Sequence, residues 1–338
     1  MSLIIKSILL SAFLLSFCLF SIPHASKAAG NKAVEKETKP TYPDVIVYGV
    51  MANFPNINSK EAQVALKFNV RKRTDTKFPN SVPQIEVIPD VETGAKMINS
   101  GKLHSLSLTG LDYVMLRKLA DVEPLFISTK TQEPVDAYVL IADNHLNLKK
   151  LALQKERKLI VESDLRPNIG ELWLNTVLWN NGYKESELFF SSIRAGDTPM
   201  RIVLPVFFGQ AEAGLLSESA FNIMVKLNPQ IGEKLTVLLR SPGFVNVVTC
   251  VPRQINKDIR DVLLDESLDL VNQDYGKQLL LVFHLKNNIS FKNEYLEETE
   301  KLFDLYEKKR KSLETERQNK IKGNAARESL NNPLPPTD

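Results

Sequence analysis

The sequence predicts an α/β protein in which two lobes, each a mixed sheet covered by helices, face each other across a ligand cleft. Short apolar runs alternate with segments of helical spacing over most of the 338 residues, as in βαβ units. The pattern restarts near Leu146, which predicts a second unit. The composition, 43% apolar and 25% charged, is that of a globular protein and excludes a disordered or collagen-like chain.

The first unit opens with a continuous apolar run at 45–50, which is typical of a strand buried on both faces. The alternation that follows predicts a mostly parallel sheet with helices on both faces. The further elements expected in this unit are a helix from Ser59, a strand at 84–88, a helix from Asp90 to Gly101, a strand at 104–108, a helix at 111–119, and strands at 122–127 and 137–141.

The second unit repeats this rhythm, and the chain then returns to the first. We expect lobe 1 to comprise 44–145 and 241–310, and lobe 2 to comprise 146–240. The elements expected after Leu146 are strands at 158–161, 188–190, 211–216, 235–239 and 245–251, and helices at 169–180, 199–209, 217–227 and within 256–283.

The first 28 residues have the pattern of a secretory signal peptide. Lys6 precedes sixteen uncharged, mostly apolar residues, and small residues follow Pro23. We therefore expect export to the periplasm with cleavage near Ala28, and an uncleaved membrane anchor is the alternative. Removal of this segment takes Cys18 and two lysines with it, which leaves a net charge of +1 and one cysteine. Residues 29–43 are expected to form a linker.

The C-terminal part of the chain is strongly charged. Residues 292–312 interleave both signs around a narrow apolar stripe, which predicts a helix docked on lobe 1, with a partner-binding helix as the alternative. Residues 311–338 contain few apolar side chains, and we expect them to form a disordered charged tail.

Several function classes find no support in the sequence. The positive charge is interspersed with negative charge, so no nucleic-acid surface is predicted. The histidines beyond residue 28 are scattered, and no nucleophile, phosphate-loop or zinc motif occurs. Cys250 stands in an apolar run and is expected to be a buried small residue. We therefore predict no catalytic residues, no metal and no cofactor.

Polar residues and one aromatic residue stand at predicted helix starts or beside predicted strands. Helix N-termini bind anions through free N–H groups and the helix dipole. Each position taken singly fits a simple cap, and only their recurrence in both lobes favours an anion site. The candidate ligand-binding residues are Phe54, Thr109, Gly110, Arg166, Asn168, Ser191, Ser192, Arg194 and Ser217.

Three of these positions have a more specific rationale. Gly110, after the possible cap Thr109, would let a ligand approach the backbone N–H groups. Arg166 would offer a fork of donors to an oxyanion beside Asn168, where Glu171 already completes a capping box. Phe54 follows the first strand and would flank a ligand.

Four stretches, in this order, are similar to periplasmic substrate-binding proteins of the phosphate/phosphonate ABC transporter type, a group that includes sulfonate-binding and transferrin-like members. They are 48–50 (YGV), 91–102 (VETGAKMINSGK), 108–113 (LTGLDY) and 204–213 (LPVFFGQAEA). The resemblance spans roughly residues 44–305 and implies a type II binding fold. It also implies that Thr109, Gly110 and Tyr113 line the cleft. At 163–171 the chain reads SDLRPNIGE, where the family usually has a Ser/Thr-rich turn that grips phosphonate oxygens.

Together, the export signal, the two lobes and the polar helix starts predict an exported solute-binding protein. It would capture a small oxyanion-bearing ligand, of the phosphate/phosphonate class by resemblance, for an ABC permease. A cell-envelope sensing or interaction module that partners a sensor kinase or a membrane complex is the alternative. We expect a monomer.

Overall fold

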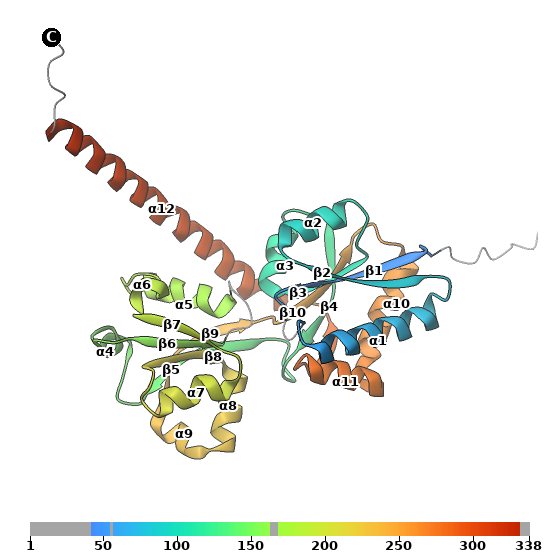
Figure 1. Cartoon of the computed structure of the whole chain (residues 1–338), viewed down its shortest axis with the longest axis horizontal. Coiled ribbons are helices and arrows are strands. Elements are labelled where there is room, and N and C mark those ends of the chain that lie inside the picture. Colours follow the sequence, from blue (N-terminus) through green and yellow to red (C-terminus); the bar gives the residue numbers. More distant parts are fainter. Residues whose placement is uncertain (1–41, 55–56, 163–167, 332–338) are drawn as a thin grey trace, which may run out of the picture. The chain divides into compact units, whose positions relative to one another are not determined.

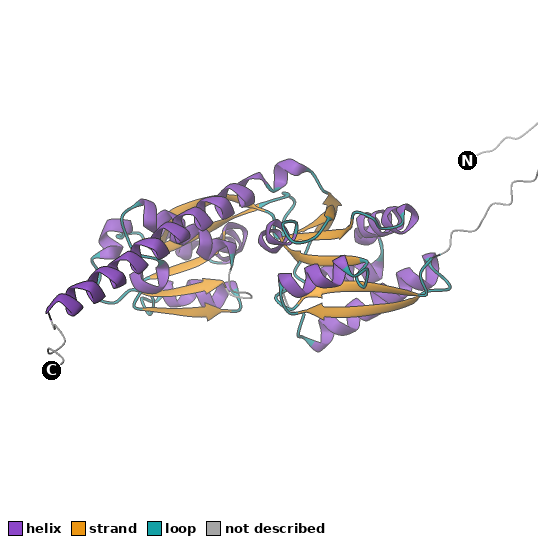
Figure 2. Cartoon of the chain, turned by 90° about the horizontal axis from the view of Figure 1, so that it is seen from above, coloured by secondary structure: helices purple, strands orange, loops and turns teal. Residues whose placement is uncertain are grey.

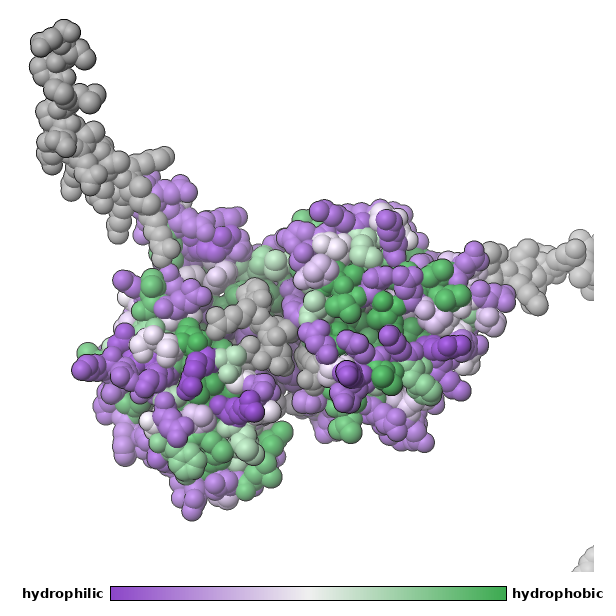
Figure 3. All heavy atoms as spheres, viewed as in Figure 1, coloured by the Kyte–Doolittle hydropathy of each residue, from purple (hydrophilic) through white to green (hydrophobic). Residues whose placement is uncertain are grey.

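The computed structural model describes residues 42–54, 57–162 and 168–331. In this part the chain builds two mixed sheets with helices on both faces of each (Figures 1 and 2). We call the six-stranded sheet with its helices lobe 1, and the five-stranded sheet with its helices lobe 2. Hydrophilic side chains cover most of the face seen in Figure 3, with smaller apolar patches on both lobes.

Lobe 1 has the strand order β11-β4-β10-β3-β1-β2. Its strands are β1 (Val45–Met51), β2 (Val82–Ile88), β3 (Ser105–Thr109), β4 (Val122–Thr129), β10 (Val247–Pro252) and β11 (Asn287–Ser290). Its helices and 3-10 turns are α1 (Lys60–Lys77), α2 (Val91–Asn99), α3 (Gly110–Leu116), α10 (Lys257–Leu268), η1 (Asp269–Asn272), α11 (Asp274–Val282) and η2 (Asn293–Tyr295). β1 runs parallel to β2 and β3, whereas β10 runs antiparallel to β3 and β4.

Lobe 2 has the strand order β7-β6-β8-β5-β9. Its strands are β5 (Asp136–Asp143), β6 (Lys158–Glu162), β7 (Ser192–Gly196), β8 (Ala213–Ser217) and β9 (Leu235–Phe244). Its helices are α4 (Leu148–Ala152), α5 (Ile169–Asn180), α6 (Ser186–Phe189), α7 (Pro199–Phe207), α8 (Glu218–Leu227) and α9 (Pro229–Lys234).

The boundaries between the lobes differ from those predicted. β5 pairs with β8 and β9, so the sheet of lobe 2 spans 136–244 and not 146–240. An apolar run such as Val139–Ala142, which is fully buried, shows in sequence that a strand is central but not to which sheet it belongs.

The helix starts form as the sequence predicts. Ser59 Oγ accepts a hydrogen bond from Ala62 N at 3.1 Å, and Asp90 Oδ1 accepts one from Thr93 N at 2.7 Å. These bonds satisfy donors that a helix leaves unpaired in its first turn. The strand expected at 188–190 is wrong, because the segment forms the short helix α6 and the strand follows as β7.

The last helix, α12 (Glu297–Asn331), is longer than predicted and contacts both lobes. It packs against α3 of lobe 1 and against α5 and β9 of lobe 2. The prediction that this helix docks on lobe 1 alone is therefore wrong. The segment expected to be a disordered tail from 311 is helical as far as Asn331. Strong helix formers and (i, i+4) pairs, such as Arg310–Glu314 at 2.7 Å, favour a helix there. Within the described residues, no helix is both long and apolar enough to cross a membrane.

Candidate functional site

The carboxyl ends of the parallel strands are where open α/β sheets bind ligands. In lobe 1 these ends include Met51 of β1 and Thr109 of β3, which run parallel to each other. In lobe 2 they are Glu162 of β6 and Ser217 of β8, also parallel neighbours. Each edge carries a cluster of polar side chains.

The lobe 1 strand-end cluster consists of Asn53, Thr109 and Asp112. Thr109 caps α3: its Oγ1 accepts a hydrogen bond from Asp112 N at 3.1 Å and donates one to Asp112 Oδ2 at 2.8 Å. Asn53 Nδ2 donates a second bond to Asp112 Oδ2 at 2.8 Å. A carboxylate of the chain itself therefore occupies the position where a helix N-terminus would attract an anion.

This cluster offers hydrogen-bond acceptors. Burial raises the pKa of Asp112, and the bonds from Asn53 and Thr109 only partly oppose that effect. Asn53 Oδ1 is buried and has no hydrogen-bond partner among the described residues. Because a carboxylate can accept but not donate, the amide must direct its NH2 group at Asp112, which leaves the carbonyl oxygen to face elsewhere.

Gly110 and Tyr113, the two other residues expected near this helix start, have different surroundings. A Cβ on Gly110 would lie 2.7 Å from Val245 O, and Gly110 N donates to Asn246 O at 3.4 Å. Gly110 therefore lets α3 pack against the connection between β9 and β10. Tyr113 is 3% exposed and belongs to the hydrophobic core of lobe 1.

The lobe 2 strand-end cluster consists of Lys130, Asp136, Glu162, Ser217 and Ser219, and it surrounds the start of α8. Glu162 Oε2 accepts a hydrogen bond from Ser217 N at 2.6 Å, and both carboxylate oxygens of Asp136 accept bonds from Ser219. Lys130 Nζ lies 3.6 Å from Glu162 Oε1 and supplies positive charge. Burial is the main cause of the raised pKa of Asp136. Two carboxylates thus hold the N-terminus of α8.

Asn168 adjoins this cluster. Its Oδ1 caps α5 by accepting bonds from Gly170 N and Glu171 N, and its Nδ2 donates to Glu162 O at 2.7 Å. The structure therefore brings Asn168 and Ser217 together around Glu162. Arg166 lies outside the described residues.

Ser191, Ser192 and Arg194 lie away from this cluster. Ser191 and Ser192 stand at the amino end of β7, the edge strand of lobe 2, and β7 runs parallel to β6. Ser191 Oγ accepts a hydrogen bond from Arg157 N at 3.0 Å. Arg194 is a residue of the strand itself and pairs with Ile160. The sequence prediction placed these residues at the carboxyl end of a strand because it assigned that strand to 188–190, whereas β7 begins at Ser192.

Phe54 lies in the interior of lobe 1. It is buried and meets Phe283 edge to face, with ring centroids 5.3 Å apart, and it lines a cavity inside lobe 1. Sequence reasoning missed Asn53, Asp136, Glu162 and Lys130 as members of the strand-end clusters. The one available signal was their position at the end or start of a strand.

The residues considered for catalysis and metal binding have structural surroundings. His104 Nδ1 accepts a hydrogen bond from Val47 N at 3.1 Å, and burial lowers the pKa of its ring. Cys250 is fully buried, and burial raises the pKa of its thiol. In the described part of the chain, no group of three or more His, Cys, Asp or Glu side chains could hold a metal ion.

Comparison with protein families identifies the class. Residues 50–295 match the model of the family described as "ABC transporter, phosphonate, periplasmic substrate-binding protein". The chain belongs to this family of periplasmic, non-enzymatic solute-binding proteins, which are components of phosphonate ABC transporters. A comparison with curated proteins found no match.

Solved structures show the same type II fold. A protein from Xanthomonas citri with bound chloride aligns with a TM-score of 0.57 at 13% identity, covering 80% of this chain and 100% of that one. The binding component of an ABC phosphonate transporter from Pseudomonas aeruginosa aligns with a TM-score of 0.52 at 14% identity, covering 84% and 99%. PhnD1 from Prochlorococcus marinus, in complex with methylphosphonate, aligns with a TM-score of 0.52 at 17% identity, covering 77% and 97%.

Proposed function

We propose that this protein captures a phosphonate-class solute that also carries a hydrogen-bond-donating group, such as an amine. The observation that supports this proposal is the acceptor-rich lobe 1 strand-end cluster, where Asn53 Oδ1 is buried beside the Asp112 carboxylate and has no hydrogen-bond partner in the described part of the chain. An unpaired buried acceptor is unfavourable until a donor reaches it. A bare phosphonate dianion offers no such donor and would be repelled by the carboxylate.

The oxyanion end of the solute would lie nearer the lobe 2 strand-end cluster. The lobe 1 strand-end cluster contains no cation. In the lobe 2 cluster Lys130 offsets the charge of Glu162, and the sequence places Arg166 two residues before the capping residue Asn168. Glu162 and Asp136 already bind the N–H groups of Ser217 and Ser219, so these donors are not free for the ligand. We infer that side-chain cations, and not the α8 dipole, attract the oxyanion.

Titration calorimetry on the exported chain tests this proposal. We expect 2-aminoethylphosphonate to bind at least about tenfold more tightly than methylphosphonate, because a hydrogen bond to a charged group contributes about 1.5–3 kcal/mol. Asp112→Asn should remove most of this preference. Asp75→Asn is the matched control, because Asp75 is an exposed residue of α1 that forms an ion pair with Arg71 on the same helix. Equal affinities for the two phosphonates would contradict the amine requirement.

We further propose that the protein is exported by residues 1–28, acts as a monomer and delivers its solute to an ABC permease. N-terminal sequencing of the periplasmic protein and light scattering test the first two points. Affinity capture of the full chain from solubilised membranes, with and without solute, tests the third. Recovery of a sensor kinase in place of a permease would favour a sensing role.

A further inference from the structure

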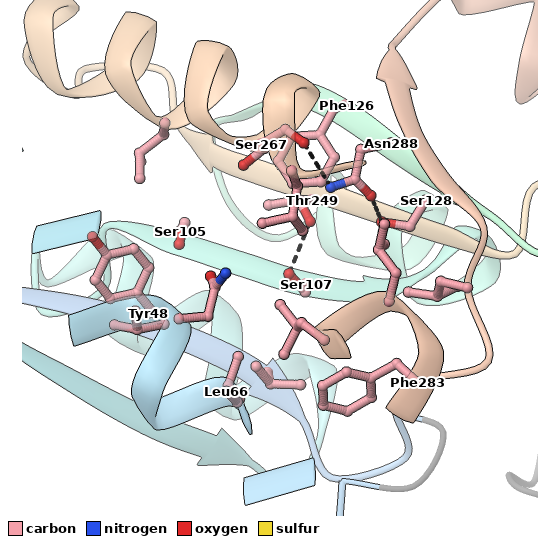
Figure 4. A pocket seen from close by; sticks show the side chains of 18 of the residues that line it. Tyr48, Leu66, Ser105, Ser107, Phe126, Ser128, Thr249, Ser267, Phe283 and Asn288 are labelled. Atoms are coloured by element: carbon pink, nitrogen blue, oxygen red, sulfur yellow. Dashed lines mark hydrogen bonds between the residues drawn. The ribbon is translucent and has the colours of Figure 1, made fainter. Parts of the chain in front are cut away.

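Lobe 1 contains a cavity of about 100 Å³ that lies apart from both strand-end clusters. Strands β1, β3, β4 and β10 form one wall, and helices α1, α10 and α11 form the other (Figure 4). None of the residues that line it belongs to either strand-end cluster, and its lining contains no Asp or Glu side chain.

Two buried polar groups in the lining lack hydrogen-bond partners among the described residues. Asn69 on α1 is 2% exposed and Ser267 on α10 is 1% exposed, yet Asn69 Nδ2 and Ser267 Oγ make no hydrogen bond to residues 42–54, 57–162 or 168–331. The neighbouring groups are already satisfied. Asn69 Oδ1 accepts a bond from Arg73, and the backbone oxygen of Ser267 accepts one from Asn288 Nδ2 at 2.9 Å. Buried polar groups are nearly always paired, so these two call for a partner in the cavity.

A guanidinium group lines the same cavity. Arg73 donates to Asn69 Oδ1 at 3.4 Å and forms no ion pair with any described residue. Glu266, the nearby carboxylate that acts on it electrostatically, pairs with Lys77 at 3.0 Å instead. Burial lowers the pKa of Arg73, the direction expected for a cation that lacks a close counter-ion. An arginine remains charged in a protein, so this position favours an anion.

Arg73 and Phe283 mark two different sides of the cavity. Arg73, Asn69 and Tyr48 lie towards one side, because Arg73 donates to Asn69 Oδ1 and the Tyr48 hydroxyl lies 3.2 Å from Oγ1 of Thr74, the residue next to Arg73 on α1. Figure 4 shows Tyr48 and Ser105 at one side and Phe283 at the other. Phe54 packs against Phe283, and leucines from α1, α10 and α11 complete the apolar wall.

We propose that lobe 1 binds a short-chain monocarboxylate in this cavity, with the carboxylate on Arg73 and Asn69 and the carbon chain against Phe54 and Phe283. An engineered cavity of about 150 Å³ holds benzene, which has six non-hydrogen atoms, so a smaller one suits a ligand of at most about six. This binding is independent of phosphonate capture at the strand-end clusters.

Equilibrium dialysis of radiolabelled butyrate against the full chain tests the proposal. Saturable binding of one butyrate per chain is expected, with no competition from saturating 2-aminoethylphosphonate or methylphosphonate. Butanol, which keeps the chain but lacks the charge, should compete at least tenfold more weakly than unlabelled butyrate. Arg73→Gln should weaken butyrate binding at least tenfold. Arg71→Gln on the same helix should not, because Arg71 is 78% exposed.

A spectroscopic readout covers the case in which Arg73→Gln fails to fold. In the unmodified ¹⁵N-labelled chain, the side-chain NH2 signals of Asn69, assigned with Asn69→Gln, should shift on addition of butyrate. No binding at millimolar butyrate would show that the cavity holds only water and would overturn the proposal. Displacement of butyrate by either phosphonate would also overturn it, because that places the carboxylate in the strand-end site.

Discussion

Gly110 shows how a residue that looks like a ligand contact can serve packing. One Cα hydrogen of Gly110 faces the backbone oxygen of Val245, and a Cβ in its place would lie 2.7 Å from that oxygen. A backbone oxygen cannot relieve such a contact by a change of rotamer, as a side-chain atom can. We therefore expect Gly110→Ala to lower the free energy of unfolding by about 1–3 kcal/mol in urea denaturation.

Gly94→Ala is the matched comparison for this change. Gly94 lies inside α2, where a Cβ would meet the flexible tip of Leu106 at 3.1 Å, and alanine also favours the helix. Its effect should be small or stabilising. Equal losses for both variants would show that the contact with Val245 is not the cause.

Asp112 gives a pH dependence whose sign follows from burial. Its pKa is raised in the folded protein, so its contribution to stability is largest below its unfolded pKa of about 3.9 and falls as the pH rises through the folded value. Asparagine does not titrate. The stability of the unmodified protein relative to Asp112→Asn should therefore be greater at pH 3.5 than at pH 7, as measured by urea unfolding at both pH values. A difference that grows with pH would contradict this assignment.

At the scale of elements, the helix α12 separates into a docked part and a distal part. The contacts between α12 and the lobes involve residues before 311. Glu300 forms an ion pair with Arg117 (N–O distance 2.6 Å), Leu302 is buried, and Tyr306 stacks on Trp179 with ring centroids 5.4 Å apart. Deletion of 311–338 should therefore change the free energy of unfolding by less than about 0.5 kcal/mol.

Deletion of 301–338 provides the comparison. It removes Leu302 and Tyr306, and truncation of one buried leucine alone typically costs about 2–5 kcal/mol. This longer deletion should destabilise the protein strongly in thermal unfolding. Similar effects of the two deletions would mean that the distal part of α12 also contacts the lobes.

The elements also show what a sequence can and cannot predict. The bounds of α5 agree with the prediction because Asn168 marks its start and the left-handed Gly182 follows its end. β5 was assigned to the wrong lobe because the pattern of a buried strand does not reveal its partners. The strand-end clusters were largely missed, since Asp136 and Glu162 meet only through the pairing of β5, β8 and β6.

At the scale of the whole molecule, the lobes are linked by more than chain connections. The chain passes between them at 130–135 and at 245–246, and α12 packs on α3 of lobe 1 and on α5 of lobe 2. Both tryptophans lie on α5, so their fluorescence reports on lobe 2 and on the stacking of Trp179 against Tyr306 of α12. Fluorescence and far-ultraviolet circular dichroism, which reports on both lobes, should give coincident unfolding transitions. Two separate transitions would show that the lobes unfold independently.

The rate at which Cys250 is modified can report how often the core of lobe 1 opens. It is the only cysteine beyond residue 28, it stands on β10 between β3 and β4, and it is fully buried. A thiol reagent can reach it only when the sheet opens, so the rate of modification measures the frequency of that opening. A solute that binds only the closed, folded protein at a hundred times its dissociation constant should slow this rate about a hundredfold. The native thiol thus records ligand binding without an engineered cysteine.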